Sequence, residues 1–286
     1  MIGSLSFATS RRLDRAAAVA IVLLASLGVS PAQTAPEKRI KLPPPPADLP
    51  GHVNYLARQL YGVALDDAEP LTSQVEKLVL DHMGPWLSAH PPNSQSAAGS
   101  RGFTYDVQVR RELERVFGEL QYPFDARCAA FEKPFGTGEL IGVGYSLGWD
   151  QFNRASVVAL FQINGEPAQQ VAVTHFAPYV DLQFQLFSPP PSAADQAWFM
   201  AYGTRLGKSH PRLSAVLYAY DGKTLQSLWQ KTDLYDGRIS FAGDRVTISC
   251  LNEDEFTQAV AARTPAIRHE TVYRVGAKGF DVESER

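Results

Sequence analysis

The segment from Gly144 to Gly148, with the sequence G-Y-S-L-G, matches the G-x-S-x-G pattern that presents a serine for nucleophilic attack. Asp236 and His269 follow Ser146 in the chain, which gives the order serine, acid, histidine. If folding joined these three side chains, Ser146 would attack an acyl carbon and His269 would take its proton. A serine hydrolase or esterase that uses Ser146 is therefore one hypothesis for this sequence.

The elements around Ser146 decide whether this chemistry is available. A nucleophile elbow needs a strand before the serine and a helix after it, because the helix N-terminus supports the oxyanion. A strand pattern does precede Ser146, but the polar segment 149–154 leads directly into another apolar strand near Val157. We therefore expect no helix there, and the two glycines are better explained by a bend and by close packing of strands. This favours a non-catalytic role for Ser146.

Two cysteines, Cys128 and Cys250, form a possible disulfide if the chain reaches an oxidising compartment. The loop that they would close is long, and the chain-entropy model gives about 4–5 kcal/mol of stabilisation for it. Alternatively, Cys250 ends the apolar side of segment 246–250, where a buried free thiol is ordinary packing. The spacing alone leaves both readings open.

The remaining polar residues predict neither a metal nor a cofactor. The six histidines are scattered, and none has the spacing of a metal-binding motif. His175 shares a strand face with Val171 and Val173, so we expect it in or near the core. The glycine-rich stretch 136–144 leads into strand, whereas a phosphate-binding loop needs a helix start. The acidic residues 253–255 are expected to form a solvated loop.

A short pattern recurs along the second half of the chain. Segment 159–165 is matched 57 positions later by segment 216–222, and a weaker copy occupies 271–276. Such a recurrence predicts a repeated supersecondary unit. Asn164-Gly165 and Asp221-Gly222 are typical of hairpin turns, since these residues tolerate positive φ. We expect about eleven strands between residues 140 and 282, in units at 140–187, at 198–241 and from about 246 onward.

The segment from Leu217 to Trp229 resembles a blade of quinoprotein-type β-propellers, in which a strand ending in Asp is followed by a turn and by a strand carrying Trp. This resemblance, local to residues 140–283, implies repeated antiparallel four-stranded meanders. Closed propellers typically have four to eight blades, and about three units are visible here. The prediction is a mainly β fold, propeller-like or an open sheet array or sandwich. We favour the open arrangement, with N-terminal helices covering one edge.

The sequence divides into four regions. Residues 1–32 are typical of a signal peptide, with arginines before the apolar run 16–29 and small residues at a cleavage site. Residues 33–52 form a proline-rich linker, 53–133 a helical region with a flexible linker near 91–102, and 134–286 the β-repeat domain. Helices are expected at 53–61, at 75–83 and at 109–120, the second begun by a capping box at Ser73 and Glu76 and stopped by Gly84-Pro85.

Charge narrows the class of partner. The net charge of the whole chain is −3, and removal of residues 1–32, which hold three arginines and one aspartate, leaves −5. No basic stripe is present, so nucleic acid is not an expected partner. Membrane contact is expected only if segment 16–29 stays uncleaved as an anchor. The sequence thus predicts an exported protein, secreted or periplasmic, that acts as a non-catalytic binding or scaffold module for an unknown ligand or protein partner.

Overall fold

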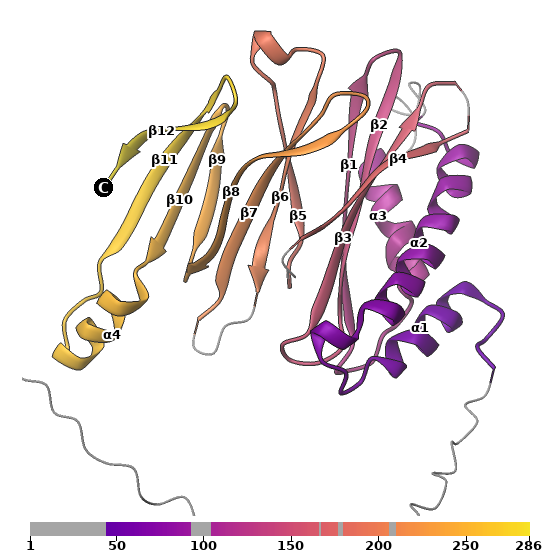
Figure 1. Cartoon of the computed structure of the whole chain (residues 1–286), viewed down its shortest axis with the longest axis horizontal. Helices are drawn as coiled ribbons and strands as arrows, with labels where there is room; N and C mark the ends of the chain where they lie inside the picture. The colour runs from indigo at the N-terminus through magenta and orange to yellow at the C-terminus, as the bar shows by residue number, and fades with distance from the viewer. Residues whose placement is uncertain (1–43, 93–103, 166, 177–179, 206–209) are drawn as a thin grey trace, which may run out of the picture. The chain divides into compact units, whose positions relative to one another are not determined.

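The computed structural model describes residues 44–92, 104–165, 167–176, 180–205 and 210–286 (Figure 1). The predicted signal peptide, the first part of the proline-rich linker and most of linker 91–102 lie outside the described residues. Residues Pro45 to Arg286 form one compact unit, and the description below concerns this unit alone.

Three four-stranded antiparallel sheets, each a simple meander, make up the β part of this unit. The first sheet consists of β1 (Asp125–Phe135), β2 (Gly138–Gly148), β3 (Arg154–Ile163) and β4 (Gln169–Phe176). The second consists of β5 (Gln183–Phe187), β6 (Ala197–Arg205), β7 (Arg212–Tyr220) and β8 (Leu225–Tyr235). The third consists of β9 (Arg238–Ala242), β10 (Arg245–Leu251), β11 (Arg268–Gly276) and β12 (Gly279–Glu285). The predicted mainly β fold with repeated four-stranded meanders is confirmed.

The recurring sequence pattern is the third strand of each sheet. Its copies lie in β3, β7 and β11, and the glycines that follow the first two, Gly165 and Gly222, have φ values of 86° and 90°. Glycine adopts positive φ without steric cost, which explains why a glycine in the turn is part of the pattern. The recurrence therefore reports a true structural repeat.

The predicted repeat boundaries are one strand out of phase. The expected units began near β2, β6 and β10, whereas the sheets begin with β1, β5 and β9. The residues Asp125 to Lys133, expected in the helical region, are part of β1 and pair with β2 along its whole length. Sequence patterns identify strands, but pairing with the next strand, which decides sheet membership, depends on tertiary contacts.

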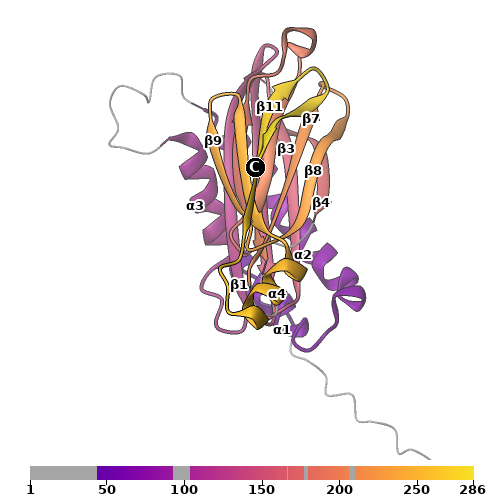
Figure 2. The same cartoon turned by 90° about the vertical axis from the view of Figure 1, so that its left-hand side faces the viewer.

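The three sheets stack face to face and, within the described residues, do not close into a propeller (Figures 1 and 2). A first core lies between the N-terminal helices and the first sheet, a second between the first and second sheets, and a third between the second and third sheets. On β3, Val157 and Phe161 point into the first core, while Val158 and Leu160 point into the second. This explains why that strand is apolar on both faces.

The helical elements before the sheets are α1 (Leu49–Gln59), η1 (Leu65–Asp67), α2 (Glu69–Ala89) and α3 (Tyr105–Phe117). Their apolar faces cover the outer face of the first sheet, as Figure 1 shows for α1, α2 and α3. The helix α2 is longer than predicted. It begins at Glu69, so Ser73 does not cap it, and it continues through Gly84 and Pro85 because packing against the first sheet outweighs the lost backbone hydrogen bond.

Two short helices lie among the later strands: η3 (Pro191–Ala193) and α4 (Glu253–Ala262). The second corrects the predicted acidic loop. The Asn252 side chain accepts hydrogen bonds from the amides of Asp254 and Glu255, and the acids occupy the first turn. Negative charge there is favourable because the first backbone amides carry partial positive charge.

Candidate functional site

Ser146 lies in the middle of β2 with no exposed surface. Its hydroxyl accepts a hydrogen bond of 2.9 Å from the hydroxyl of Ser156 on the neighbouring strand β3. The strand continues to Gly148, and a short connection then leads into β3, so no helix supports an oxyanion at this position. Asp236 and His269 have other partners, Arg268 and Glu255 respectively, around the third sheet. The structure does not bring the three residues together.

The glycines around Ser146 have packing roles. A Cβ at Gly144 would stand 2.6 Å from the ring of Phe184, which crosses over from the second sheet. A Cβ at Gly148 would meet Asp125 and Arg154 at 2.4 and 2.8 Å, because their ion pair passes directly over this glycine. The G-x-S-x-G match thus coincides with places where side chains of neighbouring elements touch the backbone of β2.

Both cysteines are free, so the possible disulfide is not formed. Cys128 lies on β1 in the first sheet and Cys250 on β10 in the third, with the second sheet between those two. Burial raises the pKa of the Cys128 thiol to about 12, and burial also raises the pKa of Cys250. A disulfide requires Cα atoms within about 7 Å of each other. The positions of the two cysteines in the sequence contain no information on this distance.

Among the described residues, no group of three or more His, Cys, Asp or Glu side chains is placed to hold a metal ion. In the same part of the chain, no helix is long and apolar enough to cross a membrane.

One ion pair, which the sequence patterns above do not predict, is repeated between sheets. Each third strand begins with an arginine: Arg154, Arg212 and Arg268. In the first and third sheets this arginine pairs with an aspartate at or just before the first strand, Asp125 or Asp236. In the sequence, the near-constant spacing of the three arginines is the signal for this pair, and the apolar pattern of the repeat does not include it.

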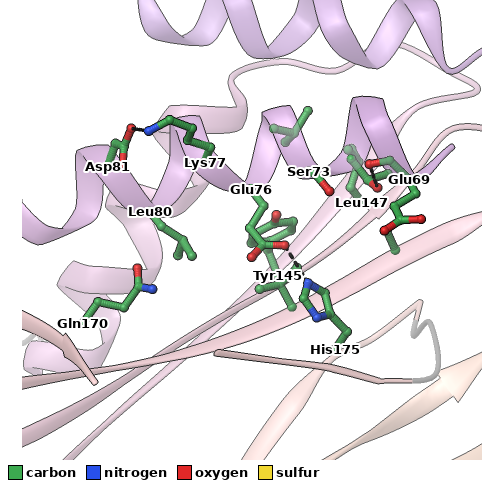
Figure 3. A pocket seen from close by; sticks show the side chains of 14 residues that line it. Glu69, Ser73, Glu76, Lys77, Leu80, Asp81, Tyr145, Leu147, Gln170 and His175 are labelled. Atoms are coloured by element: carbon green, nitrogen blue, oxygen red, sulfur yellow. Dashed lines mark hydrogen bonds and ion pairs between the residues drawn. The ribbon is translucent and has the colours of Figure 1, made fainter. Parts of the chain in front are cut away.

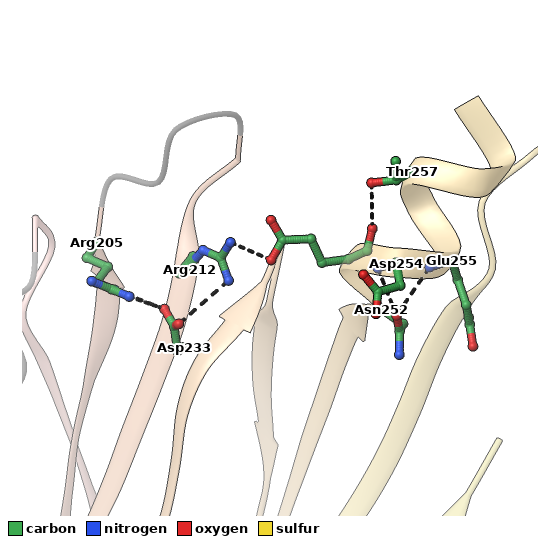
Figure 4. Close-up of polar contacts among 8 residues, drawn as sticks. Arg205, Arg212, Asp233, Asn252, Asp254, Glu255 and Thr257 are labelled. Carbon is green, nitrogen blue, oxygen red and sulfur yellow. Dashed lines mark hydrogen bonds and ion pairs between the residues drawn. The ribbon is translucent and has the colours of Figure 1, made fainter. Parts of the chain in front are cut away.

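The second sheet departs from this pattern. Its corresponding aspartate, Asp181, accepts hydrogen bonds from the backbone amide and hydroxyl of Thr204 instead. Arg212 is thereby left to bind Glu253 on α4 at 2.6 Å, and a carboxylate oxygen of Asp233 lies 3.6 Å from it (Figure 4). Arg205 binds the other side of Asp233, so a chain of alternating charges joins the second sheet to α4. Each charge in this chain has a partner, which is typical of a structural connection.

A pocket of about 450 Å³ lies between α2 and the helix-facing side of the first sheet (Figure 3). One face of α2 supplies Glu69, Ser73, Glu76 and Leu80, which recur at helical spacing. The sheet supplies the opposite wall with residues from β2, β3 and β4, among them Tyr145 and His175. Predicted as a core or near-core residue, His175 instead lies on the edge strand with 66% of its side chain exposed.

The central polar contact of the pocket joins the helix to the sheet. His175 Nε2 lies 2.6 Å from Glu76 Oε2, and the Glu76 side chain is only 21% exposed. Tyr145 lines the same pocket (Figure 3), is 2% exposed and packs on Phe117. Burial, followed by the charge of Glu76, raises the pKa of Tyr145 well above its ordinary value, so its hydroxyl keeps its proton.

The sequence analysis did not identify this pocket. Glu76 and His175 are separated by 99 positions in the chain, and no local motif links them. Glu76 was instead assigned to a capping box, because Ser-x-x-Glu before an apolar run is a common helix start. The pocket forms where α2 packs across the outer face of the first sheet.

Comparison of this chain with protein-family models, with curated protein sequences and with solved structures finds no match.

Proposed function

We propose that this protein is an exported, non-catalytic binding module that holds a small ligand in the pocket between α2 and the first sheet. The observation that carries the proposal is the pocket itself, whose volume of about 450 Å³ falls in the usual range for small-molecule sites. Its lining combines apolar side chains with polar groups, of which Glu76 and His175 contact each other. Such a mixture gives affinity through the apolar area and orientation through the polar groups.

The stack of sheets suits this role, because a binding site is most precise when it is built on rigid elements. The walls of the pocket belong to α2 and to strands β2, β3 and β4, with only short connections between these strands. The first sheet is packed on both faces, by the helices and by the second sheet. A ligand would therefore meet side chains that are already ordered, which reduces the entropy cost of binding.

A fragment screen by ligand-observed NMR tests the binding function. Ser73→Trp places a large side chain in the pocket, whereas Gln74→Trp places the same side chain on an exposed position of α2 outside the pocket lining. We expect fragments that bind the wild type to be lost from Ser73→Trp and retained by Gln74→Trp. Equal binding to both variants, or no binding to the wild type, would refute the pocket as the ligand site.

The non-catalytic and exported parts of the proposal have separate tests. A fluorophosphonate probe is expected to leave the protein unlabelled, since Ser146 has no exposed surface and donates or accepts only within the strand pair. Labelling of Ser146 would support the hydrolase hypothesis instead. For export, the intact mass of protein recovered from the expressing cell is expected to lack residues 1–32. Retention of that segment would argue for an uncleaved anchor.

A further inference from the structure

We infer that the pocket between α2 and the first sheet selects a small organic cation, a protonated amine or a guanidinium group carried on a short apolar chain. This inference rests on the proposed binding function and names the class of ligand. It is carried by the charges of the pocket, by the Tyr145 side chain in its wall, and by the place of His175 at the pocket edge.

The fixed charges of the pocket are mainly negative. Three carboxylates line it, those of Glu69, Glu76 and Asp81, against one lysine, Lys77. Lys77 is already bound to Asp81 at 2.5 Å, and both of these side chains are mostly exposed at the rim. Glu69 is exposed as well, so the inner part of the pocket offers the Glu76 carboxylate to a ligand, and an incoming anion would be repelled.

Tyr145 supplies independent support for a ligand. Its side chain is 98% buried (2% exposed), lines the pocket, and makes no hydrogen bond to any residue in the part of the chain that the structure describes. An ammonium group beside Glu76 would donate a hydrogen bond to the Tyr145 oxygen as well.

His175 occupies the position that the cation of a ligand would take. Its ring contacts the Glu76 carboxylate from the exposed edge strand β4, and most of the side chain faces solvent. A histidine so exposed loses little by turning away, so a ligand ammonium can replace its contact with Glu76. With the ammonium group bound to Glu76, the apolar chain of the ligand would lie against Val75, Leu80 and Val157 in the pocket wall.

Three probes of equal length separate charge from shape: pentylamine, 1-pentanol and pentanoate, each titrated into the full protein by calorimetry or by NMR. We expect pentylamine to bind at least about tenfold more tightly than 1-pentanol, because a charge-assisted hydrogen bond is roughly twice as strong as a neutral one. Pentanoate is expected to bind most weakly. A preference for 1-pentanol or pentanoate would overturn the cation inference while leaving the binding function intact.

The matched variants are Glu76→Gln in the pocket and Glu114→Gln on the exposed side of α3. Glu76→Gln is expected to reduce pentylamine affinity about tenfold and to leave 1-pentanol unchanged. Glu114→Gln is expected to change neither, since Glu114 lies outside the pocket lining, pairs with Arg110 at 3.6 Å and is 54% exposed. Should Glu76→Gln fail to fold, Tyr145→Phe serves as the second variant, with the same direction of change. An unchanged pentylamine affinity in a folded variant would contradict the inference, as would failure of pentylamine to bind the wild type.

Discussion

At the residue scale, separate elements of the molecule are joined by pairs of histidine and glutamate. His82 on α2 contacts Glu112 on α3 at 2.5 Å, His175 contacts Glu76 at 2.6 Å, and His269 contacts Glu255 on α4 at 2.7 Å. The first pair is the most buried, since Glu112 is 9% exposed and also accepts two hydrogen bonds from Arg115. It is the pair with the greatest consequence for stability, because charges that lose a partner in a buried place are costly.

Glu112→Gln should destabilise the protein at pH 7 by about 1–3 kcal/mol, since charge-assisted hydrogen bonds to Arg115 and His82 are lost. Burial would raise the pKa of Glu112, but these hydrogen bonds outweigh it and hold the pKa below the ordinary value of 4.5. The stability that ionised Glu112 contributes is thus present above that value and is lost as pH falls through the lowered pKa. Urea unfolding at pH 7 and below about pH 4 should show a gap between wild type and variant that narrows in acid.

The same experiment has an internal control. Glu114→Gln, on the exposed side of the same helix, should change the unfolding free energy by less than about 0.5 kcal/mol at either pH. A gap for Glu112→Gln that stays constant or widens in acid would contradict the assigned role of the carboxylate.

The thiols give a second prediction at this scale. Both cysteines should be free in the purified protein, and Cys128 should react slowly with Ellman's reagent at pH 8, because burial raises its pKa to about 12 and the thiolate is the nucleophile. Cys250 should react faster because it is less buried. Denaturation should release two reactive thiols per chain. Fewer than two in the denatured, unreduced protein would indicate that the bridge forms after all.

At the element scale, the glycines of β2 let neighbouring side chains lie directly on the strand. A Cβ at Gly142 would stand 2.0 Å from the ring of Phe131, which is buried on β1. Gly84 within α2 is different, since its Cβ would lie 3.7 Å from Phe161 in ordinary contact. Close packing therefore requires a glycine at position 142 on β2, whereas the space around Gly84 on α2 would accept a side chain.

Gly142→Ala should destabilise the protein by about 1–3 kcal/mol through overpacking against Phe131. Gly84→Ala should be neutral or stabilising by up to about 1 kcal/mol, because alanine has the higher helix propensity and space is available. Thermal unfolding followed by circular dichroism compares the two. If both variants changed stability equally, close packing would not explain the glycines of β2.

At the scale of the whole molecule, three apolar cores alternate with three sheets, and every core is shared by two layers. Both faces of the second sheet are buried along its central strands. On β6, Phe199 points to the first sheet and Met200 points to the third. A layer that depends on both neighbours cannot lose one of them without exposing a core. The stack should therefore unfold as one cooperative unit.

Leu160→Ala in the second core and Leu217→Ala in the third test this coupling. Both leucines are fully buried, and each variant should cost about 2–5 kcal/mol and shift a single transition. Tryptophan fluorescence, which reports on Trp86 and Trp149 at the first core and on Trp198 and Trp229 at the third, should shift together with the circular dichroism signal. Separate transitions for the two probes in either variant would show that the sheets unfold independently.

Much of the fold was available from local patterns. The alternation in β5, the two-faced apolar run in β3 and the turn glycines Gly165 and Gly222 each reflect the backbone geometry of their own segment. The phase of the repeat was not available, because β1 carries charged residues between its apolar ones and was assigned to the helical region. The length of α2 was missed for a related reason: Gly84-Pro85 usually ends a helix, and only packing onto the first sheet carries α2 past it.

The sequence by itself determined that this chain is mainly β, that its strands repeat, and where its turns fall, because these properties depend on residues that are neighbours in the chain. The tertiary structure alone decided how the sheets stack, that Ser146 is buried against Ser156, and that Cys128 and Cys250 lie in different sheets. It also decided the pocket, since Glu76 and His175 meet only when α2 packs on the outer face of the first sheet. Contacts between residues so far apart in the chain depend on which faces pack together, and a local pattern contains no information on that choice.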